Sequence, residues 1–282
     1  MSRSIAATLL AVGLLLPVAE VYAESFRFEV NNLITQKKDS VKVNVTLPRQ
    51  PAPARPALIY LTGCDGSIQD STRPIFDALL KQGYTIAHVQ SLGTWSRRAN
   101  ACTGEPGALT GAQHAEDAYR ARDGLVERGW AAADNVALLG YSHGGWAISH
   151  AMFLDPTPGY DTQGKPGFAA AVAFYPWCQT NDSPTFVNRT PTLMLGGDRD
   201  EWTHFSRCRQ LARAMGAAGE ANQAPLELHL YENATHSWDR NAPTREFWAG
   251  PRFGMQVLEH NPSVTADSIG RTIDWILRHT RR

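Results

Sequence analysis

The hexapeptide at residues 140–145, Gly-Tyr-Ser-His-Gly-Gly, constrains the fold of this chain more than any other stretch. It follows a strand-like run at residues 135–139 and precedes a stretch of helical character at residues 146–153. It contains the pattern G-x-S-x-G, the nucleophile elbow, in which a strand turns sharply into a helix and holds a strained serine above a sheet. Gly140 and Gly144 flank Ser142 where a Cβ atom would collide with neighbouring backbone. The sequence therefore predicts a nucleophile at Ser142, at a helix start whose free amide groups favour a developing oxyanion.

The remaining apolar runs alternate with helical patterns, and this alternation predicts an α/β fold with a doubly wound, mostly parallel sheet and helices on both faces. Nearly continuous apolar runs are typical of strands that are covered on both faces. Runs of this kind lie at residues 57–61, 84–89, 136–139, 168–174 and 192–195. Strands with one solvated face are expected at residues 26–30, 41–47 and 226–230, and helices at residues 73–82, 112–128, 205–215 and 265–278.

An acid and a base follow the serine, each after a strand-like run, in the order Ser, Asp, His. The loop at residues 196–203 contains several carboxylates, of which Asp200 is the first choice for the acid and Asp198 the second. His236 is the expected base, and His204 is its one serious rival. A histidine that takes the serine proton makes the hydroxyl nucleophilic, and a carboxylate orients the histidine and stabilises the imidazolium. Ser142, Asp200 and His236 are therefore the predicted catalytic residues.

A glycine-rich loop at residues 62–66 follows the strand at residues 57–61. Ligands of doubly wound sheets bind beyond the carboxyl ends of the strands, so this loop is expected beside the elbow. The backbone N–H groups of Cys64 and His143 are expected to form an oxyanion hole, although a tight structural turn would also explain the loop's glycines. Five aromatic residues are candidates for the substrate pocket, although packing is their more frequent role: Tyr141, Trp146, Trp177, Trp202 and Trp238.

Together these stretches resemble the dienelactone-hydrolase-like family of α/β-hydrolases over essentially all of the chain after residue 23. The matching segments are residues 61–66, 140–145, 197–203 and 231–238. The resemblance implies an α/β-hydrolase fold without a large lid domain, hydrolysis of carboxylic esters, and no metal or organic cofactor. It implies the same roles for Ser142, Asp200 and His236. The family's namesake enzymes are cytoplasmic and have a cysteine where this chain has Ser142, so the resemblance implies acyl transfer to water but does not imply a dienelactone substrate. Exported serine members of the family resemble general esterases.

Residues 1–23 have the features of a secretory signal peptide. Arg3 gives a positive start, residues 6–18 are an apolar stretch, and Val21-Tyr22-Ala23 offers small residues for cleavage before Glu24. An uncleaved anchor is the alternative. We therefore expect a single domain at residues 24–282 in the periplasm or outside the cell. The sequence contains sequons for N-glycosylation, and one of them begins at Asn233, three residues before the expected base. A glycan at Asn233 would obstruct the site, which weakly favours a bacterial, unglycosylated origin and thus the periplasm.

The four cysteines are an even set, and disulfides are the default expectation for an exported protein. Four cysteines allow three connectivities. Cys64–Cys102 and Cys178–Cys208 are favoured because each pair would join loops at the same end of neighbouring strands. No spacing typical of a metal site is present.

Lysine and arginine balance aspartate and glutamate at 27 each, which gives no support for nucleic acid or an anionic membrane as a partner. A small-molecule ester is the expected partner, and the oligomeric state is not indicated. Two other functions remain open. The first is a serine peptidase or amidase, since the same triad serves both chemistries. The second is a non-catalytic exported binding protein. The complete set of serine, aspartate and histidine counts against it, because a binding protein does not need all three side chains.

Overall fold

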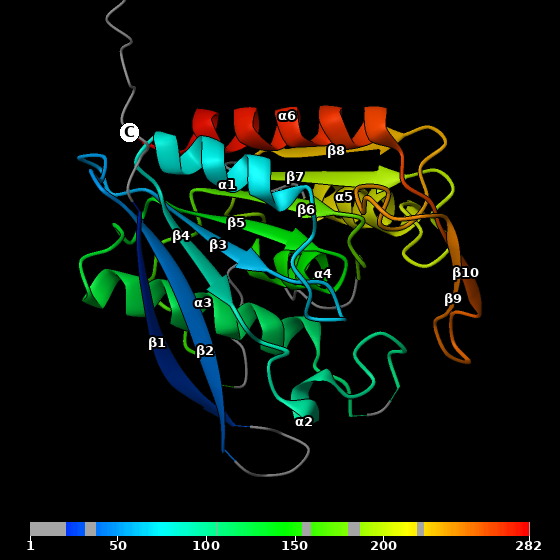
Figure 1. The fold of residues 1–282 in the computed structure, drawn as a ribbon, viewed down its shortest axis with the longest axis horizontal. Coiled ribbons are helices and arrows are strands. Elements are labelled where there is room, and N and C mark those ends of the chain that lie inside the picture. Colours follow the sequence, from blue (N-terminus) through cyan, green and yellow to red (C-terminus); the bar gives the residue numbers. More distant parts are fainter. Residues whose placement is uncertain are drawn as a thin grey trace, which may run out of the picture.

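One mixed sheet forms the centre of the molecule (Figure 1). The computed structural model describes residues 21–31, 38–105, 107–153, 159–179, 187–218 and 223–281. In these residues the sheet has eight strands in the order β1-β2-β4-β3-β5-β6-β7-β8. β1 and β2 run antiparallel to each other, β2 runs antiparallel to β4, and the strands from β4 to β8 are parallel. This is the predicted α/β sheet with antiparallel strands at one edge.

The strands of the sheet have the following bounds: β1 (Val21–Asn31), β2 (Lys38–Pro48), β3 (Ala57–Leu61), β4 (Thr85–Val89), β5 (Val136–Tyr141), β6 (Ala170–Phe174), β7 (Thr192–Gly197) and β8 (Leu226–Tyr231). The helices are α1 (Thr72–Lys81), α2 (Trp95–Arg98), α3 (Gly111–Glu127), α4 (His143–Ala151), α5 (Ser206–Ala218) and α6 (Pro262–His279). A separate hairpin pairs β9 (Arg245–Trp248) with β10 (Met255–Leu258).

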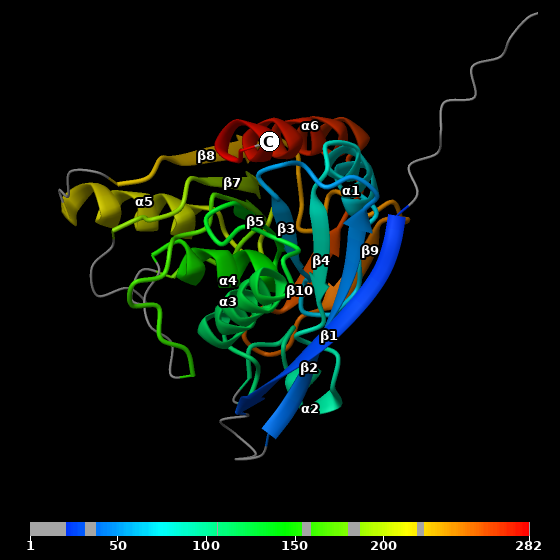
Figure 2. The same cartoon turned by 90° about the vertical axis from the view of Figure 1, so that its left-hand side faces the viewer.

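Helices cover both faces of the sheet (Figures 1 and 2). α1 and α6 pack together on one face, and α3 and α4 pack together on the other. The side chains of β3 alternate between two apolar cores, so that Ile59 belongs to the core under α3 and α4, and Leu58 to the core under α1 and α6. Continuous apolar runs such as that of β3 are thus explained by burial on both faces.

Side-chain caps define where two of the helices begin. The Thr110 side chain and Gln113 form a reciprocal capping box at the start of α3, and the Asn261 side chain accepts a hydrogen bond from the Val264 amide at the start of α6. In contrast, α4 begins directly after Ser142, which has φ of 52° and no side-chain cap. No side chain caps the first amides of this helix.

The structure forms the two disulfides Cys64–Cys102 and Cys178–Cys208, which are the pairs that the sequence favours. The signal-peptide prediction falls largely outside the described residues, because β1 begins at Val21. In the described ranges, no helix has the length and apolar character needed to cross a membrane. The segment between β6 and β7 contains no helix or strand in its described parts, residues 175–179 and 187–191, in keeping with a fold without a large lid.

Two elements were not predicted from the sequence. The short helix α2 lies in the loop at residues 91–110, and the hairpin of β9 and β10 lies between β8 and α6 in the chain. Each strand of this hairpin has four residues, which is too short for its alternation to be recognised. Both elements matter for the site, because they lie at the end of the sheet where the parallel strands terminate (Figure 1).

Candidate active site

The nucleophile elbow is built by close backbone contacts that only glycine allows. A Cβ on Gly140 would lie 2.3 Å from the carbonyl oxygen of Gly144, and a Cβ on Gly144 would lie 2.3 Å from the carbonyl oxygen of Leu61. Ser142 adopts a φ of 52°, an unusual conformation for a residue with a side chain. Its amide donates to the Phe174 carbonyl at 2.9 Å, which ties the turn to the end of β6. Such local strain is typical of a functional position that the surrounding fold stabilises.

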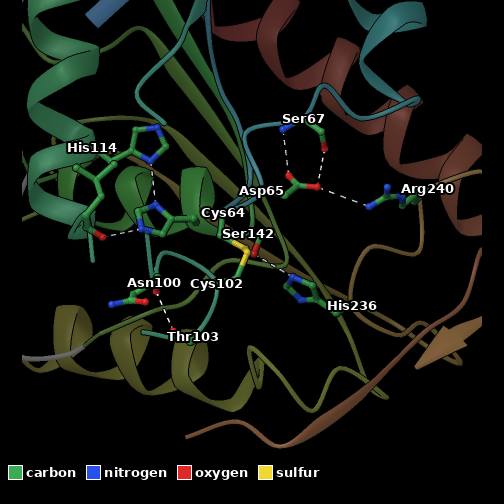
Figure 3. The surroundings of a disulfide bond; sticks show 12 residues. Cys64, Asp65, Ser67, Asn100, Cys102, Thr103, His114, Ser142, His236 and Arg240 are labelled. Atoms are coloured by element: carbon green, nitrogen blue, oxygen red, sulfur yellow. Dashed lines mark hydrogen bonds and ion pairs between the residues drawn. A yellow bond between two sulfur atoms is a disulfide. The ribbon is translucent and has the colours of Figure 1, made fainter. Parts of the chain in front are cut away.

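The structure brings the three predicted catalytic side chains together. Ser142 Oγ lies 2.9 Å from Nε2 of His236, and Nδ1 of His236 lies 2.8 Å from Oδ2 of Asp200. The three residues follow β5, β8 and β7, so the loops at the carboxyl ends of three parallel strands converge. Figure 3 shows Ser142 beside the Cys64–Cys102 disulfide, with the His236 ring turned towards it. This arrangement matches a nucleophile, a base and an orienting acid.

Asp200 is held as a buried carboxylate. Its Oδ1 accepts hydrogen bonds from the amides of Trp202 at 3.0 Å and Thr203 at 2.8 Å, and the Thr203 hydroxyl lies 2.8 Å from its Oδ2. Burial alone would raise the pKa of Asp200, but the attraction and hydrogen bond of His236 and the hydrogen bonds from Thr203 lower it below its usual value. Asp200 is therefore ionised and able to orient the imidazole.

The rival candidates lie away from this chain of hydrogen bonds. Asp198 is exposed, and its backbone amide bonds to the Tyr231 carbonyl. His204 is exposed and lines a separate polar depression with Glu201 and Arg207. Asp200 and His236 are the residues that the fold places beside Ser142.

Aromatic rings fix the plane of the His236 imidazole. The ring centroid of Tyr175 lies 4.6 Å from that of His236 on one side, and that of Trp202 lies 4.8 Å away. The Tyr175 hydroxyl in turn donates to Asp239 at 2.7 Å, and Ser71 donates to the same carboxyl group at 2.5 Å. Burial raises the pKa of Asp239, and hydrogen bonds from Ser71 and Tyr175 act in the opposite direction. Sequence reasoning missed these supporting residues, because each contact joins segments far apart in the chain.

The His143 side chain connects the elbow to the loop at residues 91–110. Its Nε2 donates to the Leu109 carbonyl at 2.8 Å, so its Nδ1 is the acceptor for the His114 ring nitrogen 3.0 Å away. Burial lowers the pKa of His143 to about 4, and burial together with His143 and Arg97 lowers the pKa of His114 well below 6.5. Both rings are therefore neutral at pH 7, and the His143 backbone amide remains the predicted oxyanion donor with that of Cys64.

Arg97 is a buried residue of that loop. Its side chain is only 5% exposed and pairs with the buried Asp117 at 2.5 Å. Its Nε also donates to the Ser91 carbonyl at 2.6 Å. The partner lies on α3, twenty positions further on, and neither residue alone signals the pairing. The ion pair fixes the loop against α3.

Two cavities open at Ser142. The larger has a volume of about 350 Å³ and is lined by Ser142, His143 and the expected Trp146, Trp177 and Trp202. The smaller has a volume of about 60 Å³ and is lined by Ser142, His236, Tyr175 and two arginines, Arg240 and Arg245. Cys64 lines both cavities and therefore lies at the boundary between them.

Tyr141 and Trp238 do not line these cavities, and their assignment to the substrate pocket is wrong. Both are fully buried in the core under α1 and α6. Tyr141 stacks on Phe174 with ring centroids 4.4 Å apart, and Trp238 stacks on the same ring at 6.1 Å. The burial of Tyr141 follows from the sharp turn at Ser142. Tyr141 comes before this turn and is the last residue of β5, so its ring lies between the sheet and its helices.

In the described part of the chain, no group of three or more histidine, cysteine, aspartate or glutamate side chains could hold a metal ion.

The sheet order, the elbow after β5 and the three converging side chains define a hydrolase of the α/β-hydrolase superfamily. A sequence model of the dienelactone hydrolase family matches residues 41–280, and the chain belongs to this family.

Comparisons with individual proteins agree on the fold. Esterase 2 of Thermogutta terrifontis has a TM-score of 0.62 and 15% identity, with 91% of this chain and 94% of that chain covered. A putative dienelactone hydrolase of Klebsiella pneumoniae has a TM-score of 0.58 and 15% identity, with coverage of 91% and 99%. A dienelactone hydrolase-like promiscuous phosphotriesterase from metagenomic libraries has a TM-score of 0.62 and 12% identity, with coverage of 92% and 99%.

A curated relative is the acylamino-acid-releasing enzyme 1 of Oryza sativa subsp. japonica, which is 25% identical over 242 residues. The match covers 73% of this chain but 30% of the rice protein, so the chain spans less than a third of that relative's length.

Proposed function

We propose that this protein is an exported serine hydrolase that cleaves carboxylic esters through Ser142, His236 and Asp200. The observation that carries the proposal is the continuous hydrogen-bonded chain from Ser142 Oγ through both nitrogens of His236 to the buried Asp200. Membership of the dienelactone hydrolase family and the fold shared with an esterase support hydrolysis as the reaction.

The reaction follows from the roles of the three side chains. Ser142 Oγ attacks the ester carbonyl carbon and gives its proton to Nε2 of His236, while the carbonyl oxygen becomes an oxyanion held by the amides of His143 and Cys64. The bond to the alcohol oxygen then breaks, and His236 protonates the departing alkoxide. Water attacks the acyl group bound to Ser142, gives its proton to His236, and Ser142 recovers that proton as the acid leaves.

Export is supported by two disulfides and by the features of residues 1–23. Cleavage after Ala23 would leave Glu24 as the first residue, within the pairing of β1 with β2. Amino-terminal sequencing of protein recovered from the periplasm or medium tests this, and an intact residue 1 in the exported fraction would contradict it.

The catalytic assignment is tested by comparing an ester and an amide of the same acyl group. We expect Ser142-dependent hydrolysis of the ester, with Ser142→Ala lowering kcat by about 10⁶-fold, as in triads that have been dissected. Hydrolysis of the amide with a kcat/KM equal to or above that of the ester would favour the peptidase or amidase alternative, which the rice relative's name suggests. Undiminished ester hydrolysis by Ser142→Ala would contradict the proposal.

A further inference from the structure

Ser142 lies between two cavities of very different size. The larger, about 350 Å³, is lined by Trp146, Trp177 and Phe253 together with Glu105 and Arg252. The smaller, about 60 Å³, is lined by Asp65, Arg240 and Arg245 together with Phe247 and Leu258, and Trp202 lines both. An ester bound at Ser142 has two arms, the acyl group and the alcohol, and each arm must enter one side. The question is which arm enters which cavity.

The position of His236 decides this question. The leaving alcohol oxygen must lie near Nε2 of His236, because that nitrogen gives it the proton. His236 lines the small cavity, and it is not among the residues that line the large one. The alcohol arm is therefore directed into the small cavity, which has room for only a few water-sized groups.

The position of the predicted oxyanion donors gives the same orientation. His143 lines the large cavity, and Cys64 lies at the boundary between the two. With the oxyanion at these amides and the alcohol oxygen at His236, the remaining substituent of the tetrahedral carbon is the acyl group. It extends along the wall that contains His143 and into the large cavity.

The walls of the large cavity are suited to a flat ring. Trp177 and Phe253 meet edge to face with centroids 5.4 Å apart, and Trp202 stacks on Phe247 at 5.1 Å, so these rings are supported by one another. The Cys64–Cys102 disulfide and the buried Arg97–Asp117 pair fix the loop that forms the opposite wall. A preformed aromatic cavity of this size favours an aromatic group over a small acyl group such as acetyl.

We infer that the substrates are esters of an aromatic or aryl-substituted acid with a small alcohol, with the acid part in the large cavity and the alcohol beside His236. This inference rests on the proposed function of Ser142 and His236, and it adds the substrate class and the orientation.

Two isomeric esters test the orientation directly. Methyl phenylacetate and benzyl acetate have the same atoms and both release unactivated alcohols, but the ring is on the acid in the first and on the alcohol in the second. We expect kcat/KM to be higher for methyl phenylacetate by about tenfold to a hundredfold. This ratio corresponds to the free energy gained by burying one phenyl ring in the transition state. Equal values, or a preference for benzyl acetate, would overturn the inference.

Variants locate the preference in the large cavity. Trp177→Ala and Phe253→Ala should each reduce the ratio of the two kcat/KM values, and Ala108→Trp should also reduce it because the larger side chain fills the same cavity. Trp248→Ala is the matched control, because Trp248 is 57% exposed on β9 and lines neither cavity. A ratio that changes in the control and not in the cavity variants would overturn the assignment.

Methyl acetate separates the two levels of the proposal. Ser142-dependent hydrolysis of methyl acetate together with a preference for benzyl acetate would contradict the orientation and leave the catalytic assignment standing. Absence of Ser142-dependent hydrolysis of all three esters would contradict the catalytic assignment, and the orientation with it.

Discussion

At the scale of single residues, burial distinguishes Asp200 from the carboxylates beside it. Asp198 and Glu201 are exposed, whereas Asp200 is 2% exposed and every hydrogen bond to it aligns it with His236 or stabilises its charge. The sequence favoured Asp200 over Asp198 by its distance from the end of the preceding strand and by its position before an aromatic residue. Its burial depends on the fold of residues 200–203 around the carboxylate, which the sequence does not reveal.

Replacing each aspartate by asparagine tests this distinction. Asp200→Asn removes the charge and presents the wrong hydrogen-bonding group to His236, so kcat should fall by about 10⁴-fold. Asp198→Asn is the control and should change kcat by less than about threefold, because an exposed side chain away from the site contributes little. Steady-state ester hydrolysis measures both, and a larger loss in the Asp198 variant would mean that the acid is misassigned.

Tyr141 and Trp238 were expected in the substrate pocket from their positions in the sequence, but both are buried through partners elsewhere in the chain, as is Arg97. Arg97 pairs with Asp117 on α3, and the two aromatic rings both pack on Phe174 of β6. Residue type and position predicted the three side chains that converge at Ser142, but long-range contacts decided which neighbouring side chains face the cavity.

At the scale of elements, the junction of β5 and α4 depends on backbone contacts closer than any side chain permits. Gly144 lies against the end of β3, and this contact holds the start of α4 over the sheet. The G-x-S-x-G pattern predicted this junction well, because its glycines are required by local geometry. The pattern could not predict the β9–β10 hairpin, whose strands pair with each other and whose Phe247 and Leu258 pack against residues such as Trp202 from other parts of the chain.

Alanine at Gly144 should therefore destabilise the protein. Its Cβ would lie 2.3 Å from the Leu61 carbonyl oxygen, so backbone must shift, and we expect the free energy of unfolding to fall by about 1–3 kcal/mol or more. Gly270 in α6 is the matched control, because its Cβ would meet nothing within 4 Å. Gly270→Ala should increase stability by about 0.5–1 kcal/mol through helix propensity. Urea unfolding of both variants measures the difference, and a stable Gly144→Ala protein would show that the contact is not required.

At the scale of the whole molecule, the parallel order from β4 to β8 brings loops from distant parts of the chain to one edge of the sheet (Figure 1). The sequence predicted this architecture because its central strands are continuous apolar runs, separated by helical patterns. It could not predict the packing of the loop at residues 91–110 onto α3 and α4, where neutral His114 and His143 lie buried beside the Arg97–Asp117 pair.

This burial makes stability depend on pH. A histidine whose pKa is lowered by folding binds a proton more readily in the unfolded chain, so acid favours unfolding between the folded and unfolded pKa values. Since burial lowers the pKa of His143 from 6.5 to about 4, this residue alone should remove about 3 kcal/mol from the free energy of unfolding as pH falls across that range. His114 acts in the same direction. Burial raises the pKa of Asp117 to about 6, and this group offsets part of the loss.

Urea unfolding between pH 7 and pH 4 measures this dependence. The free energy of unfolding should decrease steadily below about pH 6.5, the usual pKa of histidine. His114→Gln should give a shallower decrease, because it removes one of the buried titrating rings. A wild-type stability that is constant or rises over this range would contradict the assignment of neutral, buried histidines.

The convergence of Ser142, His236 and Asp200 is tested most directly by covalent labelling with a fluorophosphonate. We expect one equivalent of label, carried by the peptide that contains Ser142, slower labelling of His236→Ala, and no labelling of Ser142→Ala. Labelling of Ser142→Ala at the wild-type rate, or an unreactive Ser142 in the folded wild-type protein, would contradict the account.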